Sequence, residues 1–312
     1  MGLTQIALPS KVNDGGLMGP VCLITPPSIF LMDERVFMNL GILRVAAVLE
    51  QAGTKVEVLD LSGISNFTDA VRDHCMASEA KHFGLTATTP QLPAAVEIAR
   101  AIRAVRPEAR IILGGPHATL VNAALKREQR EGRVGRASNS LKKLEEMFDV
   151  LVAGDGEEAI FIACRPDAPK LVDADDPKSP LFLNNQRLTE LPFPARHLVD
   201  YGSYHYSIDG KRAYSLIAQL GCPFECGFCG GRESPMLRRV RTRSSESIVA
   251  EMVHMAQTMG CEGFMFYDDE LNVNPRMLDL MYLIAKAQRD NGFEWRLRGF
   301  IKAELFTDDQ AR

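Results

Sequence analysis

Short apolar runs alternate with amphipathic segments through the first half of the chain. Runs rich in Val, Ile and Leu occur at Val21–Ile24, Val56–Leu59, Phe83–Thr86, Ile111–Leu113 and Val150–Val152. Helical spacing marks Leu40–Gln51, which Gly53 closes, and Leu92–Val105. Strands that are apolar on both faces and alternate with helices form parallel sheets covered by helices on each side. The pattern predicts a doubly wound α/β domain over residues 18–163.

Two stretches break this rhythm. Lys126–Lys143 is rich in Arg, Lys, Glu and Ser, which predicts a solvated insertion or a helix extension, because charge runs usually face water. Arg165–Asn185 is polar, contains four prolines and shows no periodicity. Residues 164–210 are therefore predicted to be a linker between two domains.

Strand and helix patterns resume near Tyr214. Strands are predicted at Tyr214–Ala218, Gly263–Tyr267 and Trp295–Gly299. Helix starts are predicted at Ser244 and Ser245, at Asn274 and Pro275, and at Thr307–Asp309. Three such βα units over residues 211–312 make only an open half-barrel, because parallel strands need neighbours to bury them. We expect either a fragment or a barrel completed by another chain.

The composition changes this picture little. Apolar residues make up 46% and charged residues 24% of the chain, as in ordinary globular proteins. A formal net charge of −4 argues against a general nucleic-acid binder. No apolar run is long enough to span a membrane, and Met1–Pro20 lacks the regions of a signal peptide. We expect a cytoplasmic protein with reduced cysteines, of which Cys22, Cys75, Cys164 and Cys261 are scattered packing residues.

The remaining cysteines, Cys222, Cys226 and Cys229, have the spacing C-x3-C-x2-C. Three thiolates can hold three corners of a cubic iron–sulfur cluster and leave one iron open, and an open position distinguishes catalytic from structural metal sites. The alternative is half of a zinc site completed by Cys261 or His254. Structural zinc sites favour two C-x2-C pairs, and this chain has one.

With Phe228 before the last cysteine, this run resembles the cluster motif of the radical S-adenosylmethionine (radical SAM) enzymes. The resemblance implies that the open iron of a 4Fe-4S cluster binds S-adenosylmethionine and that its reductive cleavage gives a 5′-deoxyadenosyl radical. After the second strand, Asp268, Asp269 and Glu270 resemble the acidic loop that contacts the amino group of S-adenosylmethionine. The alternative is an acidic loop that merely leads a helix.

The loops after the strands of the first domain form a second candidate site, because open α/β sheets bind ligands at the carboxyl ends of their strands. Candidate cofactor-binding residues there are Thr25, Thr86, Thr88, Gly114, Gly115, His117, Gly154 and Glu157. The order of an early Pro-Pro, a Gly-Gly-Pro-His turn and a Gly-Asp-Gly-Glu turn resembles the cobalamin-binding domain of cobalamin-dependent radical SAM proteins. Leu191–Arg196 is similar to the bridging segment of that subfamily.

One departure concerns the cobalt. The D-x-H-x-x-G signature is absent after the first strand, where the loop reads Thr25-Pro26-Pro27-Ser28-Ile29-Phe30. The resemblance then implies a cobalt without a protein imidazole. His117 follows the fourth strand, and we expect it to be a hydrogen-bonding turn residue.

The resemblance implies a cobalamin-dependent methyltransferase that acts on an unactivated carbon, or on phosphorus, of a small-molecule substrate and receives electrons from flavodoxin or ferredoxin. Ring closure or rearrangement is the alternative within the family. A non-catalytic cobalamin-binding module and a tRNA-modifying enzyme are alternatives from other classes. One or two of the basic residues after the cysteines are expected to offset cluster charge or stay in solvent, among Arg238, Arg239, Arg241 and Arg243. Arg296 and Arg298 share one strand face and suit either a carboxylate ligand or a buried ion pair.

Overall fold

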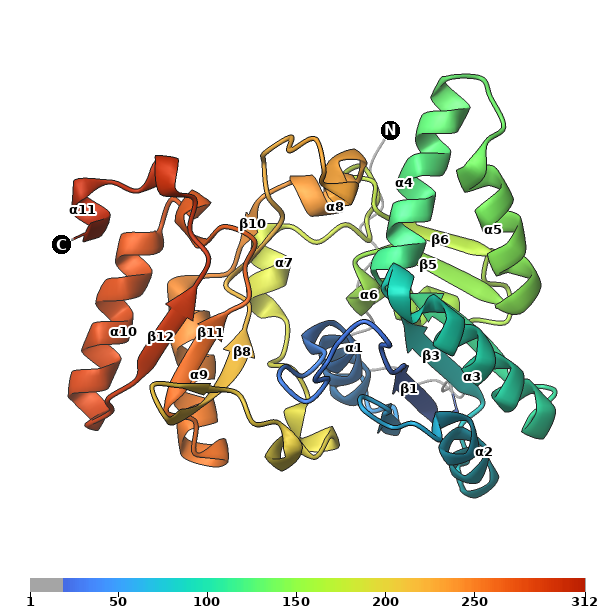
Figure 1. Ribbon diagram of the computed structural model, residues 1–312, viewed down its shortest axis with the longest axis horizontal. Helices are drawn as coiled ribbons and strands as arrows, with labels where there is room; N and C mark the ends of the chain where they lie inside the picture. Colours follow the sequence, from blue (N-terminus) through green and yellow to red (C-terminus); the bar gives the residue numbers. More distant parts are fainter. Residues whose placement is uncertain (1–18, 312) are drawn as a thin grey trace. The chain divides into compact units, whose positions relative to one another are not determined.

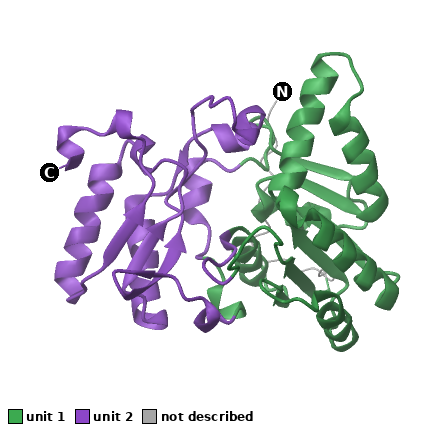
Figure 2. Ribbon diagram, viewed as in Figure 1, with its two compact units in different colours: residues 1–34, 41–182, 194–199 green, residues 35–40, 183–193, 200–312 purple. Residues whose placement is uncertain are grey.

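The computed structural model describes residues 19–311, which form two compact units (Figure 2). The first unit holds residues 41–182 with the preceding strand and loop and residues 194–199. The second holds residues 200–312 together with 35–40 and 183–193. A short piece of the amino-terminal half therefore belongs to the second unit.

The first unit is built on a six-stranded parallel sheet in the order β2-β1-β3-β4-β5-β6 (Figure 1). Its strands are β1 (Val21–Thr25), β2 (Val56–Asp60), β3 (His82–Thr86), β4 (Arg110–Gly114), β5 (Val150–Gly154) and β6 (Leu171–Ala174). Its helices are α1 (Leu40–Gln51), α2 (Phe67–Ala77), the short η1 (Thr89–Gln91), α3 (Leu92–Val105), α4 (Pro116–Arg130), α5 (Arg136–Met147), α6 (Gly156–Ala163) and η2 (Arg196–Leu198). The five predicted strands and two predicted helices of this region are confirmed.

Both faces of this sheet are buried. Cys22 and Ile24 of β1 belong to a core cluster that also contains Ile98 of α3 and Leu144 of α5. Leu23, which points to the opposite face of the same strand, is 2% exposed. Alternate residues of one strand can all be apolar only when helices cover each face, so the predicted doubly wound class is confirmed.

The predicted linker over residues 164–210 is wrong in most of its length. Leu171–Ala174 forms β6, which pairs with β5, and residues up to 182 pack in the first unit. Asn185–Glu190 forms α7 in the second unit, capped by the side chain of Asn184, which accepts a hydrogen bond from the Arg187 N–H. Four prolines concealed these short elements, because each is too short to show a period.

The charged stretch after β4 consists of the end of α4 and a separate helix, α5. The Glu128 side chain is 4% exposed, and its carboxylate accepts hydrogen bonds from the N–H groups of Gly135, Ala137 and Ser138. These donors lie in the first turn of α5, where backbone N–H groups have no partner within the helix. The helix extension is confirmed, whereas an entirely solvated insertion is wrong because one acidic residue is buried as a helix cap.

The second unit contains three parallel strands with a fourth, antiparallel strand at one edge, in the order β12-β11-β8-β7. Its strands are β7 (Ser207–Ile208), β8 (Lys211–Leu216), β9 (Gln219–Leu220), β10 (Arg241–Thr242), β11 (Gly263–Phe266) and β12 (Arg296–Gly299). Its helices are α7, η3 (Tyr201–Ser203), η4 (Gly230–Glu233), α8 (Pro235–Arg238), α9 (Ser245–Met259), η5 (Leu271–Val273), α10 (Met277–Asn291), η6 (Ala303–Leu305) and α11 (Asp308–Ala311). The three predicted βα units are confirmed (Figure 1).

Helix starts in this unit follow the predicted capping chemistry with one shift. Ser244 is the N-cap of α9, because its hydroxyl accepts a hydrogen bond from the Ser247 N–H at 3.1 Å. Asn274 instead accepts from the Arg276 N–H at 2.9 Å in a turn, and α10 begins at Met277. Within residues 19–311, no helix is both long enough and apolar enough to cross a membrane.

Candidate functional site

The cysteine loop follows β8 and β9 and is held at its entrance by Gly221. Gly221 has φ +83°, and a Cβ added there would collide with the carbonyl group of Arg239. Only glycine combines this left-handed conformation with such a close approach. The next N–H, that of Cys222, donates to the carbonyl of Leu237 at 2.9 Å. These two contacts, of Gly221 and of the Cys222 N–H, fix the backbone at the first cysteine.

The three thiols are free and accessible in different degrees. Cys222 is half-buried, whereas Cys226 and Cys229 are exposed. The Cys229 N–H donates to the Cys226 carbonyl at 3.0 Å, which closes the turn between them. In residues 19–311, the one group of three His, Cys, Asp or Glu ligand atoms within 4.8 Å of each other contains none of these thiols. Cys261 instead donates from its thiol to the Gly263 carbonyl at 2.9 Å. This arrangement lacks the convergence that a single zinc ion requires.

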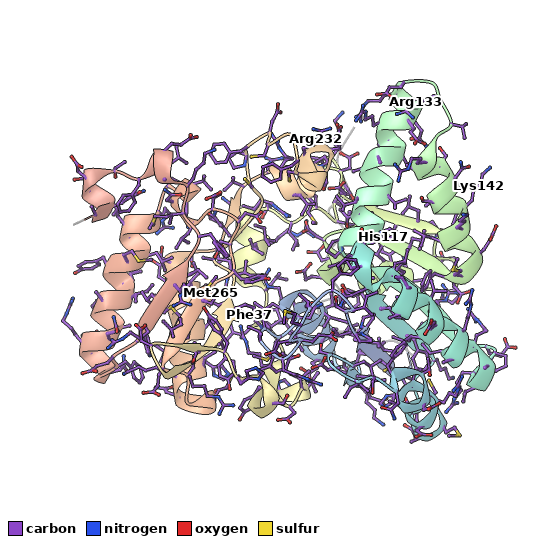
Figure 3. The ribbon with its side chains drawn as sticks, in the orientation of Figure 1. Phe37, His117, Arg133, Lys142, Arg232 and Met265 are labelled. Atoms are coloured by element: carbon purple, nitrogen blue, oxygen red, sulfur yellow. The ribbon has the colours of Figure 1, made fainter. Side chains whose placement is uncertain are left out.

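Arg238 organises the backbone of the cysteine loop. Its guanidinium donates to the carbonyl groups of Phe224 at 2.6 Å and Pro223 at 2.8 Å. Arg232, labelled in Figure 3, donates to the Gly227 carbonyl at 3.0 Å. From the sequence, one or two of Arg238, Arg239, Arg241 and Arg243 are expected to balance cluster charge or to face solvent. Arg238 has a further role, because its guanidinium and that of Arg232 hold loop carbonyls, which are strong acceptors in need of partners.

The other arginines divide between core and surface. Arg241 is 2% exposed and donates to the carbonyls of Leu183 and Met236 at 3.1 and 3.3 Å. Arg243 is also buried and pairs with Glu251 at 2.5 Å. Arg239 is exposed. Arg239 thus faces solvent, in agreement with the expectation for one or two of the four, whereas Arg241 and Arg243 are buried because alternate side chains on β10 and its flanks point into the unit.

The acidic run after β11 contains three carboxylates in three environments. Asp268 is 2% exposed, and its carboxylate accepts from the N–H groups of Ala218, at 3.0 Å, and Gln219. These bonds tie the end of β11 to the segment that leads into the cysteine loop. They give Asp268 a structural role. From the sequence, a cofactor contact was expected for all three carboxylates, without a distinction between Asp268 and the other two.

Asp269 and Glu270 are differently placed. Asp269 is exposed. Partial desolvation by neighbouring protein atoms nevertheless raises the pKa of its carboxyl above the usual range. The Oε2 atom of Glu270 is buried and has no hydrogen-bond partner among the described residues. A buried acceptor without a partner is rare in folded proteins and costs free energy unless a ligand supplies a donor.

Lys302, which follows β12, is a site residue that the sequence analysis missed. Its ammonium lies 3.7 Å from the centre of the Phe224 ring in the cysteine loop. Asn272, just after the acidic run, fixes this segment, since its side chain exchanges two 2.9 Å hydrogen bonds with the Lys302 backbone. The position of Lys302 after the third strand is the sequence signal that could have identified it, because reactive groups of βα barrels gather at the carboxyl ends of the strands.

One face of the second unit carries an aromatic cluster. The centre of the Phe37 ring lies 4.5 Å from the centre of the Tyr206 ring and 5.2 Å from the centre of the Tyr267 ring. Arg298 donates to the Tyr206 hydroxyl at 3.1 Å, and this hydroxyl lies 3.9 Å from the Met265 sulfur. Figure 3 labels Phe37 and Met265 in this region.

The two arginines of β12 do not form the buried ion pair that was one of their expected roles. Arg296 lies 3.7 Å from Asp209 in an exposed pair. Arg298 is exposed and reaches a phenol rather than a carboxylate. Its guanidinium remains available for a carboxylate-bearing ligand, the other expected role.

In the first unit, the sequence-predicted residues gather at one edge of the sheet. The strand order reverses between β1 and β3, and open α/β sheets bind ligands at such switch points. Thr25 ends β1 and is 5% exposed, whereas Thr86 ends β3. Thr88 donates to the Gln91 side chain at 2.9 Å, and Gln91 donates to the Pro26 carbonyl at 2.8 Å. This chain of bonds joins the loops on either side of the switch point.

The glycines of this edge serve close backbone packing. Gly115 has φ +89°, and a Cβ there would lie 2.5 Å from the Thr86 hydroxyl and 2.8 Å from the Ala87 nitrogen. Gly154 has φ +92°, and a Cβ there would collide with the backbone of Ala174 and Asp175. Gly114 ends β4 without such crowding. Both left-handed glycines are thus required by the fold, whatever ligand the edge binds.

His117 and Glu157 stand in the first turns of α4 and α6. The His117 Nδ1 atom lies 3.0 Å from the Thr89 hydroxyl, and its backbone N–H donates to Ala87 (Figure 3). Burial lowers the pKa of the His117 imidazole and so favours the neutral ring. This hydrogen-bonding role agrees with the expectation from the sequence. Glu157 is 7% exposed at the amino end of its helix, where a carboxylate is stabilised.

A cavity of about 280 Å³ on the second unit lies apart from these residues. Its lining comes from α7, β10 and the segment before α10, namely Asn185, Gln186, Thr189, Glu190, Thr242, Arg243, Ser244 and Arg276. At this cavity, the N–H groups of Thr242 and Ser244 donate hydrogen bonds to side chains of α7. It is a seam between packed elements and carries none of the predicted site residues.

Fold and site together define a switch-point α/β domain followed by βα units with an accessible trio of thiols. Comparison with family models agrees with both parts. Residues 34–145 match the B12 binding domain, and residues 216–312 match the radical SAM superfamily. The chain thus combines a match to the B12 binding domain with a match to the radical SAM superfamily, which confirms the resemblance, the fold class and the classes of cofactor that the sequence predicted.

Similar proteins include an uncharacterized methyltransferase, PH0819, of Pyrococcus horikoshii, 26% identical over 209 residues, 66% of this chain and 44% of that protein. An anaerobic magnesium-protoporphyrin IX monomethyl ester cyclase of Cereibacter sphaeroides is 25% identical over 240 residues, 70% of this chain and 36% of that protein. The chain thus spans less than half the length of the curated relatives it matches.

Two solved structures share the fold. TsrM from Kitasatospora setae, a radical S-adenosylmethionine methyltransferase solved with cobalamin and a [4Fe-4S] cluster, has a TM-score of 0.67 at 18% identity. That match covers 95% of this chain and 56% of TsrM. OxsB, a cobalamin-dependent S-adenosylmethionine radical enzyme, has a TM-score of 0.63 at 14% identity, covering 90% of this chain and 38% of OxsB.

Proposed function

We propose that the protein is a cobalamin-dependent radical SAM enzyme that methylates an unactivated carbon, or phosphorus, of a small-molecule substrate. The observation that carries the proposal is the arrangement of the second unit. There the accessible thiols of Cys222, Cys226 and Cys229 follow one strand, and the orphaned carboxylate oxygen of Glu270 follows the next. Parallel strands of one sheet bring such ends to the same edge.

The thiol loop suits an iron–sulfur cluster. Three free thiols on a backbone held by Arg238 and Arg232 can ligate three irons without rearrangement of the protein core. Gly227 has open space where a side chain would stand, so the loop leaves room for a bulky group. When bound, the cluster supplies an electron to S-adenosylmethionine, and methylcobalamin supplies the methyl group.

The acidic loop suits the ammonium group of S-adenosylmethionine. Glu270 provides a buried acceptor that lacks a donor within the described residues, and Asp269 stands beside it. An ammonium group would satisfy this acceptor through a charge-assisted hydrogen bond. Asp268 contributes indirectly, since its bonds to Ala218 and Gln219 fix the position of the run.

The carboxyl edge of the first unit suits cobalamin. The loop after β1 exposes four consecutive apolar side chains, Ile29, Phe30, Leu31 and Met32, next to the switch point. Exposed apolar surface of this kind marks a binding site for a ligand or a partner. Thr25, Thr86 and Thr88 provide hydroxyls for polar groups of the ligand. The Thr89 hydroxyl engages His117 Nδ1, and we assign His117 to positioning this turn.

The similarity to PH0819 and to TsrM, a methyltransferase solved with a tryptophan substrate, supports methylation of a small molecule. Flavodoxin or ferredoxin is the class of reductant that such chemistry needs. Ring closure is the second candidate, because the cyclase of Cereibacter sphaeroides is similar over 70% of this chain. The product mass distinguishes the two reactions, since methylation adds one methylene group to the substrate and ring closure adds none.

Metal content tests the proposal. After anaerobic reconstitution with iron, sulfide and hydroxocobalamin, and removal of free cofactors, we expect about four irons and one cobalt per chain. Cys222→Ala should lose the iron and retain the cobalt. Cys261→Ser, which replaces a buried cysteine outside the loop, is the matched control and should retain both metals.

Iron without cobalt would remove methylcobalamin from the mechanism and leave radical chemistry alone. The absence of both metals from a folded chain would overturn the proposal. Turnover of S-adenosylmethionine to 5′-deoxyadenosine that is lost in Cys226→Ala would in turn exclude a non-catalytic cobalamin-binding module.

A further inference from the structure

The amino-terminal part of the first unit brings together a cysteine, a glutamate and a histidine. Cys22 is the second residue of β1 and Glu57 the second residue of β2, and the two are register partners in the parallel sheet. His74 lies in the last turn of α2, which covers that face. The ligand atoms of all three side chains lie within 4.8 Å of one another. Because these residues begin their strands, they lie at the edge opposite to the predicted cofactor edge.

The sulfur–nitrogen distance agrees with one shared ion, and the nitrogen–oxygen distance is slightly shorter than such an ion requires. The His74 Nε2 atom lies 3.4 Å from the Cys22 sulfur and 3.0 Å from Glu57 Oε2. Ligands bound to a tetrahedral zinc ion at bond lengths of about 2.3 Å for sulfur and 2.0 Å for nitrogen or oxygen stand about 3.3–3.5 Å apart.

A neighbouring hydrogen bond orients one of the three side chains, and two of them are accessible to solvent. Ser78, just after α2, donates from its hydroxyl to Glu57 Oε2 at 2.6 Å, the kind of outer contact that orients metal-binding carboxylates. Cys22 is fully buried, whereas the side chains of His74 and Glu57 are 28% and 21% exposed. The partly exposed His74 and Glu57 side chains therefore give an ion access from solvent.

We propose that Cys22, Glu57 and His74 form a site for a divalent ion of the zinc class, separate from the iron–sulfur and cobalamin sites. A mixed sulfur, nitrogen and oxygen donor set is typical of zinc. Binding displaces the Cys22 thiol proton to solvent and ties β1, β2 and α2 together. The site is independent of the methyltransferase proposal, since it shares no residue with it.

The test uses Co²⁺ and Zn²⁺ with the full chain, in which Cys222→Ala, Cys226→Ala and Cys229→Ala remove the competing thiols. We expect one Co²⁺ per chain with a near-ultraviolet thiolate-to-cobalt band, which Zn²⁺ abolishes. Cys22→Ser should eliminate the band, and His74→Ala should weaken binding at least tenfold. Ser78→Ala should weaken it about tenfold, as for other outer contacts.

Cys75→Ser is the matched control, because Cys75 is buried beside His74 but does not belong to the trio, and it should bind as the parent does. Should the triple variant fail to fold, zinc measured in the reconstituted protein, with Cys22→Ser compared with Cys75→Ser, decides the question. Absence of binding, binding unaffected by Cys22→Ser and His74→Ala, or equal loss in Cys75→Ser would overturn the proposal.

Discussion

The guanidinium of Arg243 lies 2.5 Å from the carboxylate of Glu251, and these side chains are only 4% and 1% exposed. Arg243 also donates to the Ile217 carbonyl at 3.0 Å, at the end of β8. The ion pair therefore joins α9 to the segment that carries the cysteine loop. A buried charge that loses its partner is costly, although the intact pair adds little net stability.

We expect Glu251→Gln to destabilise the second unit by about 3–5 kcal/mol, because Arg243 would be buried without a counter-charge. Urea unfolding followed by the fluorescence of the single tryptophan, Trp295, reports on this unit. Glu246→Gln is the control, since Glu246 and Arg276 form an exposed pair at 3.8 Å, and its loss should cost less than about 1 kcal/mol. Equal effects of the two variants would contradict the argument.

Glu128 makes stability depend on acid pH. Hydrogen bonds from the Ser138 hydroxyl and from the first N–H groups of α5 lower the pKa of Glu128 to about 2, from 4.5. The folded state thus prefers the ionised form, and the stabilisation is present above pH 4.5 and lost as pH falls toward 2. Thermal unfolding of Glu128→Gln should show lower stability at neutral pH and lack this acid-dependent part. Glu146→Gln, an exposed change on α5, controls for the lost charge, and an identical profile in both variants would contradict the assignment.

Alkylation should separate the cysteines into two groups. Burial raises the pKa of Cys75 to about 11 and that of Cys164 to about 12, so little thiolate exists in either at pH 8. Cys226 and Cys229 are exposed. Iodoacetamide treatment of the cluster-free chain, read by peptide mass mapping, should label the loop cysteines first. Labelling of Cys75 or Cys164 at the rate of Cys226 would show that the first unit opens readily.

Gly154→Ala should destabilise the first unit more than Gly132→Ala. Both glycines have positive φ, +92° and +65°, so each alanine meets the same kind of backbone strain. Only at Gly154 would the new Cβ also collide with the backbone, that of Ala174 and Asp175. We expect about 1 kcal/mol for Gly132→Ala and several kcal/mol for Gly154→Ala in urea unfolding followed by circular dichroism. Similar losses would mean that β6 yields at this contact.

Lys302→Met should lower the reduction potential of a reconstituted cluster. Lys302 places a positive charge against Phe224 in the cysteine loop, and positive charge stabilises the reduced, more negative state. A tenfold change in the reduction equilibrium corresponds to about 59 mV for one electron. A redox titration monitored by electron paramagnetic resonance measures it, with Lys302→Arg as the charge-conserving control. An unchanged potential in Lys302→Met would show that solvent screens this charge.

The sequence by itself determined those features that local chemistry specifies. Buried parallel strands are apolar on both faces, so β1, β3, β4 and β5 could be located from their short apolar runs. The helix caps at Ser244 and the cysteine spacing could be recognised because their chemistry lies within a few residues. The edge strand β6 escaped prediction, since its four residues alternate in burial and stand among prolines.

The tertiary structure decided what depends on residues distant in sequence. Asp268 and Glu270 stand two positions apart in one acidic run. The first is bound by backbone N–H groups, whereas the second has a buried oxygen without a partner among residues 19–311. Arg238 and Arg243 read alike in the chain but hold a loop and a buried carboxylate, respectively. Cys22 and His74 come together only because β1 and α2 pack on one sheet face. The spacing of residues in the sequence determines which functional groups a segment carries. The hydrogen-bond partners and the burial of those groups arise only when separate segments pack together.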